Sequence, residues 1–186
     1  ILDLAIAQAK EWTTTAPHTR TSINLSGVQL SMPGFAERLI ERVEQAGLGT
    51  WPVVFEITET ALMENLEVGR QGLQLLQDSG YRVVIDDFGT GHSSLALLDE
   101  LPVAGLKLDK KFIQRLAEDP TARTVVGAIV SVAGAYDLLT TAEGIEDGET
   151  LQIVRDLGID YGQGFYMCMP APAEGMAELL NRGFMV

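Results

Sequence analysis

The sequence predicts an α/β fold in which a parallel sheet is covered by helices. Six short apolar runs of strand type occur along the chain, and most are followed by turn residues and a segment with helical periodicity. Strands that alternate with helices in this way pair in parallel, because each helix returns the chain to the same end of the sheet. With 186 residues, of which 46% are hydrophobic, the chain can bury a sizeable core. We therefore expect residues 1–186 to form one domain.

The expected elements follow one another as strand-helix units. Strands are expected at 21–26, 53–58, 82–88, 105–109, 138–145 and 161–169, and helices near 34–46, 65–79, 93–100, 120–135, 147–157 and 172–181. A further helical pattern opens the chain at Ile1 without a preceding cap. Pro120 stands where a first helical turn accepts proline. Gly47, Gly80 and Gly158 stand where helices are expected to end.

Polar residues at the strand ends indicate a barrel rather than an open sheet. Five of the expected strands carry such residues at or near the carboxyl end, and the sixth carries one nearer its start: Asn24, Glu56 with Glu59, Asp86 with Asp87, Lys107 with Asp109, Glu143 with Glu146, and Gln163. A (β/α) barrel collects such groups over one mouth, whereas an open sheet rarely uses so many strands. A complete barrel has eight strands and about 250 residues. We therefore expect a TIM-like (β/α) barrel with about six of its eight strands, the others missing on the amino-terminal side.

The stretch YRVVIDDFGTGHSSL, residues 81–95, places two adjacent carboxylates at the end of an apolar strand. Burying an unpaired carboxylate is costly, so solvent, a cation or a metal should offset the charge. Successive strand side chains point to opposite faces, so Asp86 and Asp87 should diverge unless the backbone turns, which suits two neighbouring ions better than one. Oxygen ligands without clustered histidine or cysteine favour Mg²⁺ or Mn²⁺. Two such ions about 3.5 to 4 Å apart can activate a water and hold a phosphodiester for in-line displacement.

Each of these polar residues also has a simpler interpretation. Taken alone, Asp86 and Asp87 fit a capped loop start about as well as a metal site. Salt-bridged strand ends account better for Glu56, Lys107 and Glu143 one at a time. Polar ends on successive strands favour one shared site over these separate explanations. The glycines of GTGHSS imitate a dinucleotide-binding loop only weakly, because the third glycine is absent and two carboxylates precede the loop.

Composition limits the classes of partner. A formal net charge of -13 argues against binding a nucleic-acid polymer through the surface field, although a small anion remains compatible if a metal supplies positive charge. The single cysteine, Cys168, excludes a disulfide framework within the chain and fits a reducing, cytoplasmic compartment. The sequence contains no apolar run long enough to span a membrane and no recognisable signal peptide.

Six motifs, in this order and at these spacings, resemble the EAL domain family of bacterial cyclic di-GMP phosphodiesterases: SINLSGVQL, FEITETALM, VVIDDFGTGHSSL, LKLDKKF, TAEGIE and DYGQGF. The resemblance covers nearly the whole chain. It implies a TIM-like barrel that hydrolyses cyclic di-GMP to linear pGpG with two Mg²⁺ or Mn²⁺ ions, acting in bacterial second-messenger signalling. The family also implies partners, because sensor or GGDEF-type (diguanylate-cyclase-like) domains often accompany it. Separately, the unpaired edges of an open barrel would invite strand addition or a homodimer.

The resemblance also implies roles for individual residues. Asn24 and Glu56 would ligate one metal, Asp86 would bridge both, and Asp87 and Glu143 would serve the second. Lys107 would orient the attacking water, and Gln163 would hold a water or the substrate. The loop DFGTGHSS, with Gly89, Thr90 and Ser93, would order the metals, and Glu59 and Glu146 would steady it.

One family motif is absent from this sequence. The Glu-x-Leu-x-Arg motif, whose glutamate is a metal ligand and whose arginine holds a substrate phosphate, does not occur. The activity of the chain by itself is therefore in question. Two alternatives stay open: a non-catalytic module that binds cyclic di-GMP or another protein, and another metal-dependent phosphohydrolase on the same barrel.

Overall fold

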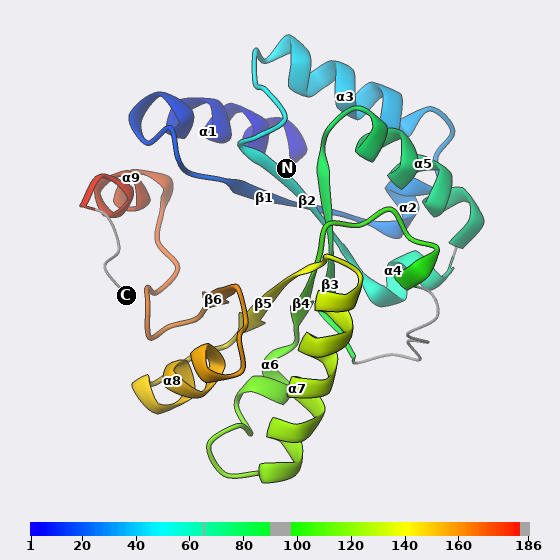
Figure 1. The fold of residues 1–186 in the computed structure, drawn as a ribbon. Helices are drawn as coiled ribbons and strands as arrows, with labels where there is room; N and C mark the ends of the chain where they lie inside the picture. The colour runs from blue at the N-terminus through cyan, green and yellow to red at the C-terminus, as the bar shows by residue number, and fades with distance from the viewer. Residues whose placement is uncertain (65, 90–97, 183–186) are drawn as a thin grey trace. The chain divides into compact units, whose positions relative to one another are not determined.

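The computed structural model describes residues 1–64, 66–89 and 98–182, which form two compact units. Unit 1 comprises Ile1–Ile57, Ala61–Val83 and the chain from Ala171 onward; unit 2 comprises Thr58–Thr60 and Val84–Pro170. The elements of each can be followed by label in Figure 1. The expectation that residues 1–186 form one domain stays a prediction.

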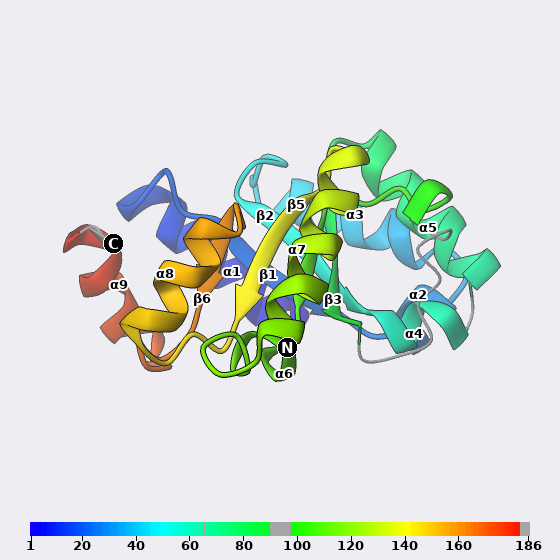
Figure 2. The same ribbon diagram turned by 60° about the horizontal axis from the view of Figure 1, so that its bottom comes forward.

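Unit 1 pairs two parallel strands and surrounds them with helices. β1 (Thr21–Leu25) pairs with β2 (Val53–Thr58), in register from Thr21 opposite Val53 to Leu25 opposite Ile57. The helices are α1 (Leu2–Thr15), α2 (Gly27–Leu30), α3 (Phe35–Gln45), α4 (Glu59–Glu64, which starts in unit 2), α5 (Leu66–Asp78) and α9 (Ala173–Arg182). Figures 1 and 2 both show α3 beside α5, and these two helices are in contact.

The sequence of residues explains why β2 and α2 form where they do. In β2 the alternate residues Val53, Phe55 and Ile57 are fully buried, which leaves Glu56 on the other face of the strand. In α2 the Ser26 hydroxyl accepts from the Gln29 N–H while the Gln29 side chain accepts from the Ser26 N–H. This capping box explains how a four-residue helix begins immediately after β1.

Unit 2 contains the other strands. β3 (Arg82–Phe88, which begins in unit 1) pairs with β4 (Gly105–Leu108), β4 with β5 (Leu139–Glu143), and β5 with β6 (Tyr161–Gln163), all in parallel. The helices are α6 (Lys110–Ile113), α7 (Pro120–Ala135) and α8 (Gly148–Asp156). An aspartate precedes each of them and accepts a backbone N–H: Asp109, Asp119 and Asp147.

The observed elements match most of the expected ones. Gly47, Gly80 and Gly158 follow α3, α5 and α8 with positive φ, as expected of residues that end helices. The last strand is shorter than expected, 161–163 instead of 161–169. The chain turns at Gly164, whose carbonyl accepts from both Met167 and Cys168, so the residues after Gln163 do not continue the ladder.

Three short helices, α2, α4 and α6, were not expected, because a four- to six-residue segment gives little periodicity. Most of the helix expected at 93–100 lies outside the described residues. Among the residues that the structure describes, none of the helices is both long enough and apolar enough to cross a membrane.

Two glycines of unit 2 give a matched pair of stability predictions. A Cβ built on Gly105 of β4 would lie 2.5 Å from the carbonyl oxygen of Leu139, whereas one on Gly134 of α7 meets nothing within 4 Å. Gly105→Ala should lower the free energy of unfolding by about 1 to 3 kcal/mol, since the backbones of β4 and β5 must separate. Gly134→Ala should raise it by about 0.4 to 1 kcal/mol by restricting the unfolded chain. Urea denaturation checks both values, and equal effects of the two substitutions would contradict the close strand packing.

Candidate metal centre

β3 ends in a backbone turn that changes where its two aspartates point. Asp87 has a φ of 54°, in the left-handed region that residues with a Cβ rarely adopt. The register of β3 against β4 shifts between Ile85 and Phe88, so the ladder is irregular where the aspartates stand. The Asp87 N–H donates to Asp86 Oδ1 at 3.1 Å. The turn that would keep the two carboxylates from diverging is therefore present.

A third carboxylate joins them from the end of β5. Asp86, Asp87 and Glu143 each offer one oxygen, and these three atoms all lie within 4.8 Å of one another. Three carboxylates so close repel one another unless positive charge is nearby. Hard divalent cations take such oxygen ligands, so this group, here called the carboxylate centre, fits Mg²⁺, Mn²⁺ or Ca²⁺.

Lys107 supplies positive charge to the carboxylate centre from β4, the strand between β3 and β5. Its Nζ lies 3.0 Å from Asp86 Oδ1 and 2.5 Å from Glu143 Oε1. The Lys107 side chain is only 7% exposed, so these ion pairs are shielded from solvent. Lys107 therefore fixes the positions of two carboxylates that come from different strands.

The pKa values of two carboxylates at the centre are raised, mainly by burial, and Lys107 offsets this only in part. Burial raises the pKa of Asp87, as do the nearby Asp86 charge and a hydrogen bond with Asp109, while Lys107 lowers it. Burial also raises the pKa of Glu143, against the opposing hydrogen bond and charge of Lys107. Both charged forms are thus disfavoured relative to water, and a bound divalent cation would relieve this cost.

Asp109 adjoins the carboxylate centre through Asp87, although the sequence identified it only among the polar residues at the strand ends and gave it no role of its own. It is 7% exposed, its side chain hydrogen-bonds Asp87, and its Oδ1 accepts from the Lys111 N–H at 2.8 Å. The signal for it was the alternation along the strand expected at 105–109, which places Asp109 on the same face as Lys107. Asp109 thus links α6 directly to Asp87.

The segment after β3 is held by Glu59. Glu59 is 5% exposed, and its Oε2 accepts from the Gly89 N–H at 3.0 Å. Its Oε1 is buried and has no hydrogen-bond partner among the described residues. Glu146, the other residue expected to steady this loop, is exposed and accepts from Gln114 Nε2 at 2.9 Å. Thr90 and Ser93 lie outside the described residues, and the role of this loop stays a prediction.

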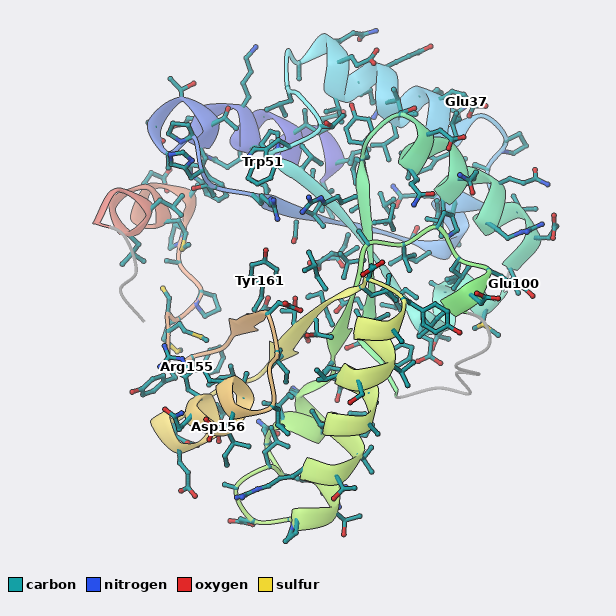
Figure 3. All side chains as sticks on the ribbon, in the orientation of Figure 1. Glu37, Trp51, Glu100, Arg155, Asp156 and Tyr161 are labelled. Atoms are coloured by element: carbon teal, nitrogen blue, oxygen red, sulfur yellow. The ribbon has the colours of Figure 1, made fainter. Side chains whose placement is uncertain are left out.

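Gln163 stands beside Glu143 in the register of β5 and β6. Residues two apart on a strand share a face, so Gln163 points to the side of Tyr161. Figure 3 shows Tyr161 directed away from α8, on which Arg155 and Asp156 are labelled. Gln163 is exposed on that face, and its role toward a water or a substrate stays a prediction.

Unit 1 holds the remaining expected ligands. Asn24 of β1 and Glu56 of β2 are direct partners in the register of the two strands. Glu56 is buried, whereas Asn24 is exposed. The two residues therefore form a neighbouring amide and carboxylate, and their role as metal ligands stays a prediction.

Comparisons with known proteins give one consistent result. A family model described as "EAL domain" matches residues 1–170. The chain is 34% identical over 182 residues to cyclic di-GMP phosphodiesterase PdeR of Escherichia coli, an alignment that covers 98% of this chain and 27% of PdeR. More generally, the chain spans about a quarter of the length of the curated relatives it matches.

Two solved structures are similar in fold. The EAL domain of Mycobacterium smegmatis DcpA matches with a TM-score of 0.92 and 35% identity, covering 98% of this chain and 82% of that one. Klebsiella pneumoniae BlrP1, solved as a manganese/cy-diGMP complex, matches with a TM-score of 0.84 and 28% identity, covering 91% of this chain and 43% of BlrP1. These matches confirm the predicted fold class: the six described strands correspond to part of a TIM-like barrel.

The carboxylate centre predicts a stability change that depends on metal and pH. Asp87→Asn should raise the Tm of the metal-free protein at neutral pH, because the raised pKa means that the folded state disfavours the Asp87 charge. Because the pKa of Asp87 is raised in the folded state, this residue stabilises the fold at a pH below the ordinary pKa of a carboxyl group. That stabilisation is lost as the pH rises through the raised pKa. The gain in Tm should therefore be larger at about pH 7.5 than at about pH 4.5.

Mn²⁺ should stabilise the wild-type protein more than the Asp87→Asn variant. A hundredfold excess over Kd stabilises a folded protein by about 2.7 kcal/mol, so the wild-type Tm should rise clearly and that of Asp87→Asn much less. Scanning fluorimetry with Mn²⁺ or with EDTA measures both effects, and Asp156→Asn on α8 is the charge-matched control. Equal Mn²⁺ shifts in wild type and Asp87→Asn would exclude Asp87 as a ligand.

Proposed function

The chain belongs to the EAL domain family, and we propose that it hydrolyses cyclic di-GMP to linear pGpG in a metal-dependent reaction. The carboxylate centre and its buried lysine are the observation that supports this most strongly, with Lys107 Nζ 3.0 Å and 2.5 Å from oxygens of Asp86 and Glu143. PdeR, which is named a cyclic di-GMP phosphodiesterase, supports the choice of substrate.

We assign the metal ligands by combining the centre with the family motifs. Asp86, Asp87 and Glu143 would hold divalent cations, and the family motifs assign Asn24 and Glu56 as an amide and a carboxylate ligand of one ion. Such ions supply a Lewis acid for the phosphoryl oxygens and lower the pKa of water. Mn²⁺ and Mg²⁺ both suit all-oxygen ligands, and the BlrP1 complex with manganese makes Mn²⁺ the first ion to test.

The protein's own groups have distinct tasks in this proposal. Lys107 carries only N–H donors, so its ammonium can hold the attacking water by its oxygen while it fixes Asp86 and Glu143. Gln163 would add an amide beside Glu143 to hold a water or the substrate. The water oxygen forms a new bond to phosphorus as the water gives up a proton, the bond from phosphorus to a ribose oxygen breaks, and that oxygen leaves as a hydroxyl, so that the proton lost by the water balances the one it gains. Placement of the water in line with the leaving oxygen is the main contribution of these residues.

The catalytic assignment predicts that the purified chain, with Mn²⁺, converts cyclic di-GMP to linear pGpG. Glu143→Gln should reduce the rate by about a hundredfold or more, because it removes a charge from the centre where the reaction occurs. Glu56→Ala should also abolish most of the activity. Glu149→Gln on α8, an exposed residue outside the centre, is the matched control and should keep the wild-type rate.

Chromatography of the products separates the alternatives. Linear pGpG from wild type and Glu149→Gln, but not from Glu143→Gln, supports hydrolysis at the carboxylate centre. Binding of cyclic di-GMP without product would make this chain a binding module and contradict the catalytic assignment. Cleavage of simple phosphodiesters as fast as of cyclic di-GMP would contradict the proposed substrate.

A further inference from the structure

Helix α6 touches the backbone segment that carries Asp87 at two points. Asp109, which caps α6, hydrogen-bonds the Asp87 side chain. Phe112, in the same helix, lies against Gly89: a Cβ built on Gly89 would be 2.8 Å from Phe112 Cε2 and 3.0 Å from Cζ. Such distances mean that the edge of the Phe112 ring is in direct contact with the Gly89 backbone.

The contacted segment has an unusual conformation that its surroundings must maintain. Asp87 has a φ of 54° and Gly89 a φ of 91°, and the residue between them, Phe88, is 4% exposed. A non-glycine residue in the left-handed region persists only where neighbouring groups hold it. The Gly89 N–H is bonded to Glu59, and the Phe112 ring occupies the space into which Gly89 would otherwise move.

We propose that Phe112 is a positioning residue for the carboxylate centre. By packing on Gly89, the ring keeps the segment from relaxing toward a regular strand, in which Asp87 would point away from Asp86. Phe112 therefore affects the binding of the cation, because it maintains the backbone conformation of Asp87. This inference rests on the proposed function, because it assumes that the centre binds a divalent cation.

The neighbour of Phe112 allows a structural role to be separated from a positioning role. Ile113 is fully buried in the same short helix, whereas Phe112 is only half-buried. Ile113→Val removes one buried methylene from α6 and should weaken the fold without altering the contact with Gly89. It is thus a control for loss of stability in the same element.

The test is the Mn²⁺ affinity of the purified chain, measured by calorimetry and by electron paramagnetic resonance of free Mn²⁺, together with the Tm of each variant. Phe112→Ala should weaken Mn²⁺ binding about tenfold or more, as changes to groups that orient ligands commonly do. Phe112→Leu, which keeps apolar volume but lacks the ring edge, should also weaken binding and serves if the alanine variant does not fold. Phe112→Tyr, which keeps the ring, should retain an affinity within about twofold to threefold of wild type, well short of that loss.

Two results would overturn the inference, and only the second would also overturn the proposed function. If the folded Phe112→Ala or Phe112→Leu protein binds Mn²⁺ as tightly as wild type and Ile113→Val, Phe112 has only a packing role while the proposed function stands. If wild type itself binds no Mn²⁺, the carboxylate centre is not a metal site, and the proposed function fails together with this inference.

Discussion

The charge balance between Lys107 and the carboxylates around it is the interaction on which the site depends. Lys107 lies within 3.0 Å of Asp86 and 2.5 Å of Glu143 and is almost fully buried, so it joins strands β3, β4 and β5 through one ammonium group. Removing one partner of a buried ion pair typically costs about 3–5 kcal/mol, because the other charge remains without compensation. Yet the pKa values of Asp87 and Glu143 stay raised, mainly through burial. Lys107 therefore offsets only part of the cost of burying these carboxylates, and an added cation would offset more of it.

The parallel sheet explains why these groups can meet at all. Strands β3, β4 and β5 are neighbours in the sheet of unit 2 and run in the same direction, so their carboxyl ends lie at one edge. The local backbone then adds what a regular strand cannot provide. The positive φ of Asp87 and the irregular register of β3 place two successive carboxylates at one centre, and Glu59 and α6 hold the residues that follow. The carboxylate centre therefore depends both on the parallel order of the strands and on the left-handed backbone at Asp87.

Residue pattern predicted most of the fold because apolar runs and helix ends depend on nearby residues. Strands at 53–58 and 82–88 and the helix at 120–135 occur where expected. The short extent of β6 was not predictable, since the turn at Gly164 competes with an apolar continuation that reads as strand. Alternation along the strand expected at 105–109 places Lys107 and Asp109 on one face, but only the three-dimensional structure shows that Asp109 contacts Asp87. Likewise, no local pattern relates Phe112 to Gly89, because the two residues lie far apart in the sequence, with β4 between them.

The position of a bound cation would test the account most directly. Crystals grown with Mn²⁺, measured with X-rays near the manganese absorption edge, give anomalous peaks only where the ion binds. The account predicts a peak within direct coordination distance of oxygens from Asp86, Asp87 and Glu143, with Asp87 still in the left-handed conformation. An ordered Mn²⁺ peak elsewhere, with the three carboxylates contacting only Lys107 and solvent, would contradict it.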